Sequence, residues 1–379
     1  MANKTNMVSE LVPSLKTAIG SGSFTQDISH SNVTQGYFSR VSYDYIQRYL
    51  FEVNARYDGS YVFREGSRWG LFPSFSAGWN VHNESFWKIN ENLITTLKFR
   101  GSWGQLGNQQ ISAFSDIELI KFSSDPLEWI YNFGDIRPVG YTLMPSIVNK
   151  NLTWETATTK NLGLDISFLN NKLQANVDVY ERITVDMVGP AEEKPGVLGA
   201  NMPRMNNASL RTRGWEISLK WRQSIKQNLS YFIDLNLYDQ KSVVTKYYNP
   251  EGVLSTWYEG AEIGEIWGYT VHDLFRTQEE LDEYLKNTDP KFISTNWKTG
   301  DVRYEDINND GVVNNGKNTI YDSGDRSIIG NSQPRYQFGI STGLNYKNFN
   351  FSMLWSGVAK RDIFPDRQYN TTMENFRLL

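Results

Sequence analysis

Hydrophobic and polar residues alternate in many segments of this chain. Segment 215–221, for example, has the sequence WEISLKW. Its apolar side chains fall on one face of an extended strand and its polar ones on the other, because successive strand side chains point to opposite faces. Alternation of this kind, together with many β-branched and aromatic residues, predicts about ten strands. They are expected at 37–45, 49–62, 75–81, 96–103, 162–168, 173–185, 215–221, 229–244, 336–346 and 349–355.

The connections between these strands are alternately short and long. Short links are expected at 46–48, 169–172 and 347–348, whereas 104–158, 186–214 and 246–334 are much longer than hairpin loops. In an up-and-down antiparallel sheet, the hairpin turns lie at one end and the returning connections at the other. Short turns at one end and long loops at the other are typical of outer-membrane β-barrels.

The orientation of the two strand faces is the central question. Polar positions include Arg40, Asp44, Glu52, Asn54, Arg56, Asp165, Asp178, Glu216 and Asp234, and apolar positions include Val53, Ala55, Leu164, Ile166, Val177, Val179, Ile233, Leu235 and Leu237. A soluble barrel turns its apolar face inward, whereas a membrane barrel turns it toward lipid, and both give the same alternation. The strand lengths and the sorted loops favour the membrane barrel. The alternative is a secreted, soluble β-rich carbohydrate-binding module with a calcium-stabilised loop.

Composition narrows the functional classes. The chain has 379 residues with 21 Tyr, 20 Phe and 12 Trp, a content that suits the aromatic girdles of membrane barrels. A net charge of -4 without a dense Lys/Arg tract argues against a nucleic-acid partner. The absence of cysteine excludes a disulfide framework. Catalytic residues are not indicated by any motif, so we expect no enzyme activity.

One helix is expected inside the longest connection. Thr277 and Glu280 have the spacing of a capping box, and Leu281, Tyr284 and Leu285 form one apolar stripe after it.

The segment 306–311, DINNDG, matches the start of a calcium-binding loop. The twelfth position, which is Glu in an EF-hand, is Lys317, so a complete EF-hand is excluded. The alternative is a tight turn held by Asp and Asn side chains without an ion. We expect that the protein requires no cofactor, and Ca²⁺ is the candidate ion for this turn. Its candidate ligands are Asp306, Asn308, Asp310 and Asp325.

Aromatic residues in the long connections are candidates for stacking on a sugar or another ligand. The alternative for each is that it packs one loop onto another. The candidates are Trp129, Tyr131, Trp257, Tyr258 and Trp267.

A series of motifs gives the sequence a family resemblance. They include YFSRV at 37–41, RWGLFPSFSAGW at 68–79, LKFRGSWG at 97–104, NLGLD at 161–165 and GEIWGY at 264–269. In this order they resemble the C-terminal barrel portion of the SusC/RagA-like family of TonB-dependent outer-membrane transporters, from about residue 37 onward.

The resemblance implies an all-β, antiparallel up-and-down transmembrane barrel in the cell outer membrane, of which this chain supplies about ten strands. Such barrels have about 22 strands and a plugged lumen. The family imports oligosaccharides or peptides with energy from the TonB complex, and a SusD-like surface lipoprotein caps its loops. The implied topology makes the 347–348 turn periplasmic. Residues 247–333 are then a large extracellular loop carrying the helix and the Asp-rich turn.

The chain is also expected to be partial. Residues 1–379 contain no recognisable plug domain, TonB box or signal peptide, and about ten strands are roughly half of the implied barrel. The expected partners are outer-membrane lipid, a SusD-like lipoprotein, an oligosaccharide or peptide ligand, and the TonB complex acting through the missing N-terminal plug.

Overall fold

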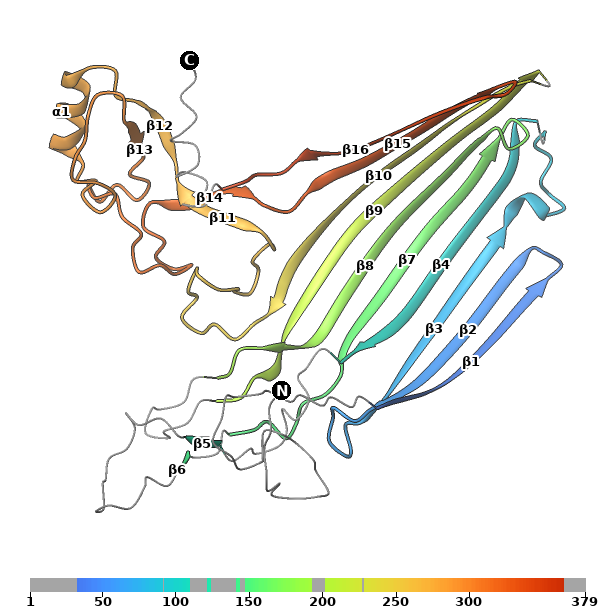
Figure 1. The fold of residues 1–379 in the computed structure, drawn as a ribbon, viewed down its shortest axis with the longest axis horizontal. Helices are drawn as coiled ribbons and strands as arrows, with labels where there is room; N and C mark the ends of the chain where they lie inside the picture. Colours follow the sequence, from blue (N-terminus) through green and yellow to red (C-terminus); the bar gives the residue numbers. More distant parts are fainter. Residues whose placement is uncertain are drawn as a thin grey trace, which may run out of the picture.

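The computed structural model describes residues 33–90, 92–109, 121–123, 141–143, 147–192, 202–226 and 228–364. A ten-stranded antiparallel sheet dominates it, in the order β1-β2-β3-β4-β7-β8-β9-β10-β15-β16 (Figure 1). The strands are β1 Thr34–Tyr45, β2 Tyr49–Ser60, β3 Trp69–Asn80, β4 Ile94–Asn108, β7 Glu155–Phe168, β8 Leu173–Gly189, β9 Met205–Lys226, β10 Leu229–Lys246, β15 Arg335–Tyr346 and β16 Phe349–Lys360. β1 and β16 form the two edges of the sheet.

All ten predicted strands are present, and most are longer than the sequence pattern predicted. β9, for example, extends over Met205–Lys226, whereas alternation indicated only 215–221. Its first half, with the sequence MNNASLRTRG, is mostly polar but pairs with β8 on one side and β10 on the other. Hydrogen bonds of the ladder continue where the hydrophobic pattern stops, so periodicity marks the apolar part of a strand better than its ends.

The connections sort to two ends of the sheet, as predicted (Figure 1). Short links join β1 to β2, β7 to β8, β9 to β10 and β15 to β16 at one end, which we call the turn end. Here Ile46 (φ 52°) and Gln47 (φ 54°) both have positive φ, which matches the right-handed twist of a hairpin. The opposite end, which we call the loop end, carries the long connections, including 247–334 between β10 and β15.

Aromatic rings gather at both ends of the apolar face. Tyr57 stacks on Trp69 near the loop end, with ring centroids 4.8 Å apart. Near the turn end Tyr49 stacks on Tyr45 at 6.5 Å. Tyr49 and Tyr57 are eight residues apart on β2, which is about 27 Å along a strand. At the roughly 35–45° tilt of barrel strands this length rises by about 20 Å, so the two aromatic pairs lie near the edges of an apolar band about 25 Å high.

The described part of the sheet has no hydrophobic core along its length. Its one buried apolar cluster, Phe63, Phe72 and Trp154, involves residues near the loop end. The side chains of Leu235 and Val179 are exposed along the strands. The apolar face therefore lacks any covering from the described residues, contrary to what a soluble sandwich or barrel requires.

The long connection 247–334 has its own small fold. It contains β11 Glu265–Tyr269 paired with β14 Arg326–Asn331, β12 Val271–Leu274 paired with β13 Val302–Tyr304, and helix α1 Gln278–Asn287. The predicted helix is confirmed: the Thr277 side chain caps α1 by accepting from the Glu280 backbone N–H. The other elements are the 3₁₀ turn Val81–Asn83 and the pair β5 Lys121–Ser123 with β6 Tyr141–Leu143. Among the described residues, no helix has the length and apolar character needed to cross a membrane.

Candidate functional site

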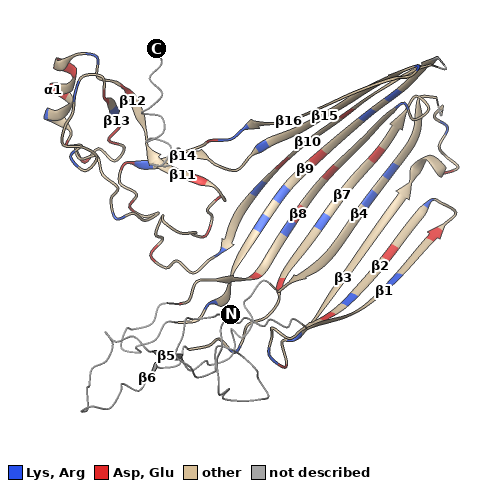
Figure 2. Ribbon diagram, viewed as in Figure 1, with Lys and Arg blue, Asp and Glu red and all other residues tan. Residues whose placement is uncertain are grey.

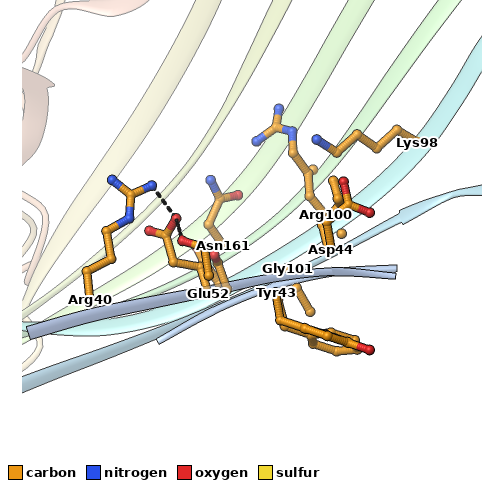
Figure 3. Close-up of a pocket in the computed structure, with 16 residues that line it drawn as sticks. Arg40, Tyr43, Asp44, Glu52, Lys98, Arg100, Gly101 and Asn161 are labelled. Atoms are coloured by element: carbon orange, nitrogen blue, oxygen red, sulfur yellow. Dashed lines mark hydrogen bonds and ion pairs between the residues drawn. The ribbon is translucent and has the colours of Figure 1, made fainter. Parts of the chain in front are cut away.

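The polar face of the sheet is hollowed. A cavity of about 560 Å³ lies against β1–β4 and β7. Figure 3 shows Arg40, Glu52, Lys98 and Arg100 on the side of the sheet that bears this cavity, whereas Tyr43 points away on the other side. The direction follows from strand alternation, because Arg40 and Tyr43 are separated by an odd number of positions.

An ion network crosses three strands on this face. Arg100 of β4 donates from Nε to Asp165 of β7 at 2.9 Å, and from Nη1 and Nη2 to the two carboxylate oxygens of Asp178 of β8 at 2.8 and 2.7 Å. Asn176 donates to Asp165 at 2.7 Å, and Asn161 donates to Asp178 at 3.0 Å. Such bidentate, charge-assisted pairing fixes the guanidinium in one orientation.

A glycine makes this reach possible. Gly163 is directly paired with Arg100 on one side and Asp178 on the other. A Cβ atom at Gly163 would lie 2.5 Å from the Arg100 Cζ atom, so any larger residue would displace the guanidinium. A glycine also makes room for a long side chain at Gly214, over which the Tyr180 ring lies. The Tyr180 hydroxyl donates to Gln240 Oε1 at 3.1 Å.

Several residues of opposite charge are paired on the polar face. Figure 2 shows acidic and basic residues distributed along the strands of the sheet, among them β1, β2, β4 and β7 to β10. The ion pairs on this face, besides those of Arg100, are Arg40–Glu52, Arg56–Asp58 and Arg222–Asp234. The result is a hydrated wall of fixed, alternating charges, suited to contact polar ligands or another protein domain without covalent chemistry.

The predicted loop aromatics have three different outcomes. Trp129 and Tyr131 lie outside the described residues. Tyr258 and Trp267 come together within the loop: the Tyr258 hydroxyl donates to Glu265 at 2.5 Å and lies beside Trp267. Burial, with help from Glu265, raises the pKa of Tyr258 to about 12.

Trp257 remains accessible. Its ring packs at 5.6 Å from that of Tyr247 and is 40% exposed. Of the three described candidates, Trp257 therefore presents the most open aromatic face. Ligand binding by all of these residues stays a prediction.

The Asp-rich turn is held by its own carboxylates. Asp306 accepts the backbone N–H groups of Asp310 and Gly311, at 3.2 and 2.8 Å. Asp325, which is fully buried, accepts those of Ile307 and Asn314, both at 2.8 Å.

The other two candidate ligands interact with each other. The Asn308 amide donates to Asp310 at 2.9 Å. In the described residues no three Asp, Glu, His or Cys side chains converge as metal ligands do. The Asx-turn alternative accounts for these contacts, and Ca²⁺ binding stays a prediction, which titration calorimetry with CaCl₂ would test.

The sequence pattern did not single out the residues that organise the polar face. Arg100, Asn161 and Asn176 are ordinary members of alternating strands, and their partners depend on strand register. The available signal was Gly163, a glycine inside a strand, since such a residue often marks a close approach by another group.

Long antiparallel strands, an uncovered apolar face with aromatic ends, a hollowed polar face and sorted loops together define a transmembrane β-barrel of the outer-membrane kind. The chain belongs to the TonB dependent receptor-like, beta-barrel family, whose model matches residues 9–375. The sequence resemblance to SusC/RagA-like receptors is thereby confirmed, as are the barrel fold and the outer-membrane location. The soluble binding-module alternative is excluded by this membership and by the uncovered apolar face.

Two curated relatives have similar sequences. The chain is 28% identical over 353 residues to TonB-dependent receptor P3 of Formosa agariphila, covering 89% of this chain and 33% of the relative. It is 29% identical over 345 residues to TonB-dependent receptor SusC of Bacteroides thetaiotaomicron, covering 88% and 32%. The chain thus spans about a third of the length of these relatives.

A solved structure has the same fold. The RagAB peptide importer in its closed-closed state superposes with a TM-score of 0.66 at 19% identity, over 92% of this chain and 36% of that one. The relatives are TonB-dependent receptors, which are transporters and not enzymes.

Proposed function

We propose that this chain supplies a wall and the extracellular loops of an outer-membrane importer of oligosaccharides or other oligomeric nutrients. The hollowed polar face, with its Arg100–Asp165–Asp178 network, carries this proposal. Fixed charges that alternate in sign offer many weak polar contacts, which suit a neutral, hydroxyl-rich or peptide ligand passing through a wet interior. Oligosaccharide is the ligand class that we infer from the SusC/RagA-like resemblance, and peptide, which the name of the RagAB peptide importer states, is the alternative.

Partner proteins would supply the energy for import and would help to capture the nutrient. We infer that the TonB complex drives import through a plug domain, and that a SusD-like lipoprotein closes over the long loops, including 247–333. The names of the relatives support the TonB complex, and the family resemblance supports the lipoprotein, for which the loop end, where the long connections gather, offers the contact surface (Figure 1).

Growth and uptake would test the transport step. We expect disruption of the gene in its source bacterium to abolish growth on one class of oligosaccharide while growth on the corresponding monosaccharide is unchanged. A protonophore should stop uptake of the labelled oligosaccharide by wild-type cells, because TonB-dependent import needs the proton gradient. Unchanged growth on every oligosaccharide and peptide tried would contradict the proposal.

The ligand-binding role of the loop aromatics has its own test. Trp257→Ala should weaken oligosaccharide binding by roughly 5- to 10-fold, since an aromatic contact of this kind is worth about 1 kcal/mol. Tyr321→Ala is the matched control, because Tyr321 is an exposed loop aromatic outside the predicted set. Equal losses of affinity in the two variants would show that the effect is not specific to Trp257.

A further inference from the structure

The apolar face of the sheet ends in a row of charged residues near the loop end. Strand register aligns Trp103 of β4 with Lys160 of β7, Glu181 of β8, Arg213 of β9 and Lys241 of β10. Each of these residues is an even number of positions from an apolar residue of its own strand, so by alternation all five side chains leave the sheet on the apolar face.

Apolar rows lie directly below this charged row. One step toward the turn end, register aligns Leu162, Val179 and Trp215, and the next row contains Leu164 and Val177. The charged row therefore marks the height at which the sheet emerges from the hydrocarbon, and Trp103 and Trp215 lie where interfacial tryptophans are expected.

A groove joins the two rows. It has a volume of about 550 Å³ and is lined by Leu162 and Val179 from the apolar row and by Lys160, Glu181 and Arg213 from the charged row. Leu162 is 67% exposed and Val179 is 50% exposed. An outward-facing glycine, Gly101, is the neighbour of Leu162 on β4, and its missing side chain leaves one flank of Leu162 uncovered.

The charged edge of the groove has an excess of positive charge. Glu181 accepts from Arg213 at 2.6 Å, and Lys160 and Arg211 also act on its carboxylate. Three cations therefore face one anion. Lys241 contributes little to this excess, because its ammonium group is paired with Glu262 at 2.5 Å.

We propose that this groove binds a lipid with a phosphorylated headgroup on the outer surface of the barrel. An acyl chain would lie along Leu162 and Val179, and the phosphate would contact Lys160 and Arg213. The arrangement combines the two features that such a ligand requires, an apolar floor at hydrocarbon depth and a cationic edge one residue row above it. The proposal rests on the membrane barrel itself and is independent of which nutrient is imported.

Lipid retention would test the site. The receptor, purified from outer membranes in neutral detergent, is incubated with dimyristoyl phosphatidic acid or dimyristoyl phosphatidylcholine, and retained lipid is counted by native mass spectrometry. Wild type should prefer phosphatidic acid. Lys160→Ser combined with Arg213→Ser should reduce this preference roughly thirtyfold, as two basic residues near an anionic headgroup are worth about that factor.

Two further variants test whether binding depends on positive charge at the groove's edge and whether the lipid binds on the apolar face. Glu181→Gln should increase retention of phosphatidic acid, because it removes the only anion of the groove's edge and frees Arg213. Lys220→Ser, which removes a cation from the polar face of β9, should leave retention unchanged. Heat-modifiable gel migration of every variant reports folding of the barrel, and it needs neither substrate nor TonB.

Several results would overturn the proposal. One is equal retention of the two lipids by wild type, and another is an unchanged preference in the folded double variant. Displacement of phosphatidic acid by an equal concentration of inorganic phosphate would also overturn it, because the groove would then be a plain anion site. Unchanged nutrient uptake after disruption of the gene, together with the expected lipid retention, would count against the import proposal alone.

Discussion

The sheet and the 247–334 connection stabilise their structures in opposite ways. In the connection, Phe275, Leu281 and Tyr284 form a buried cluster with Trp297 packed against it, as in any small water-soluble fold. In the sheet, aliphatic side chains such as Leu235 stay exposed and the charges are paired on the opposite face. The loop is therefore stabilised as a fold in water, and the sheet as a fold in lipid. An apolar residue is buried by its neighbours in the loop, whereas lipid must cover it in the sheet.

The largest expected effect is in the loop core. Phe275→Ala should cost about 3–5 kcal/mol of local stability, because it leaves a cavity in a cluster where Phe275 is only 2% exposed. Limited proteolysis should then cut within 247–334 while heat-modifiable migration of the barrel is kept. Phe292→Ala is the control, since Phe292 is 58% exposed. Loss of the folded barrel in the Phe275 variant would show that the two regions are not independent.

An arginine introduced on the lipid-facing side should destabilise the barrel more than one introduced on the wet side. Val177→Arg should destabilise the barrel by about 2–4 kcal/mol, the cost of arginine at mid-membrane depth. Ser218→Arg is the matched control, because Ser218 is adjacent on β9 but faces the wet side. Urea unfolding in lipid vesicles measures both variants. Equal destabilisation would contradict the assignment of the faces.

The Arg100 network should contribute less than the lipid-facing surface. Arg100→Ala should cost about 1.5–3 kcal/mol, because Asp165 and Asp178 lose charged hydrogen bonds while partly shielded from water. Arg40→Ala removes a pair whose arginine is 65% exposed, and should cost under about 1 kcal/mol. The same urea titration gives both values, and a larger loss for Arg40→Ala would refute the ranking.

The smallest effect is a titration in the loop. The pKa of Tyr258 is raised to about 12, mainly by burial, so the folded loop holds this proton more tightly than the unfolded chain does. Its contribution to stability is complete below about pH 10, the ordinary tyrosine pKa. It is lost as pH rises from there to about 12.

The difference in ultraviolet absorbance between wild type and Tyr258→Phe should show one tyrosine ionising near pH 12. A difference spectrum with its midpoint near pH 10 would contradict the buried environment.

Sequence reasoning reached the strands, the two faces and the helix capped by Thr277, because each depends on local periodicity or local capping. It missed contacts that depend on strand register. Neither the bridge from Arg100 to Asp178 nor the row of Lys160 and Arg213 can be read from one strand, since each joins residues tens of positions apart. The loop core was also missed, because Trp297 lies in an irregular segment without periodicity.

The bridge from Arg100 to Asp178 over Gly163 also fixes the pairing register of β7. If β7 were to pair one position out of step, every side chain on it would exchange sides, because the repeat along a strand is two residues. Asp165 would then face acyl chains, and the guanidinium of Arg100 would meet a bulky residue in place of the gap. Intermediates with the wrong strand register are therefore less stable while the hairpins assemble. A contact of the folded barrel thus also selects the correct register during folding.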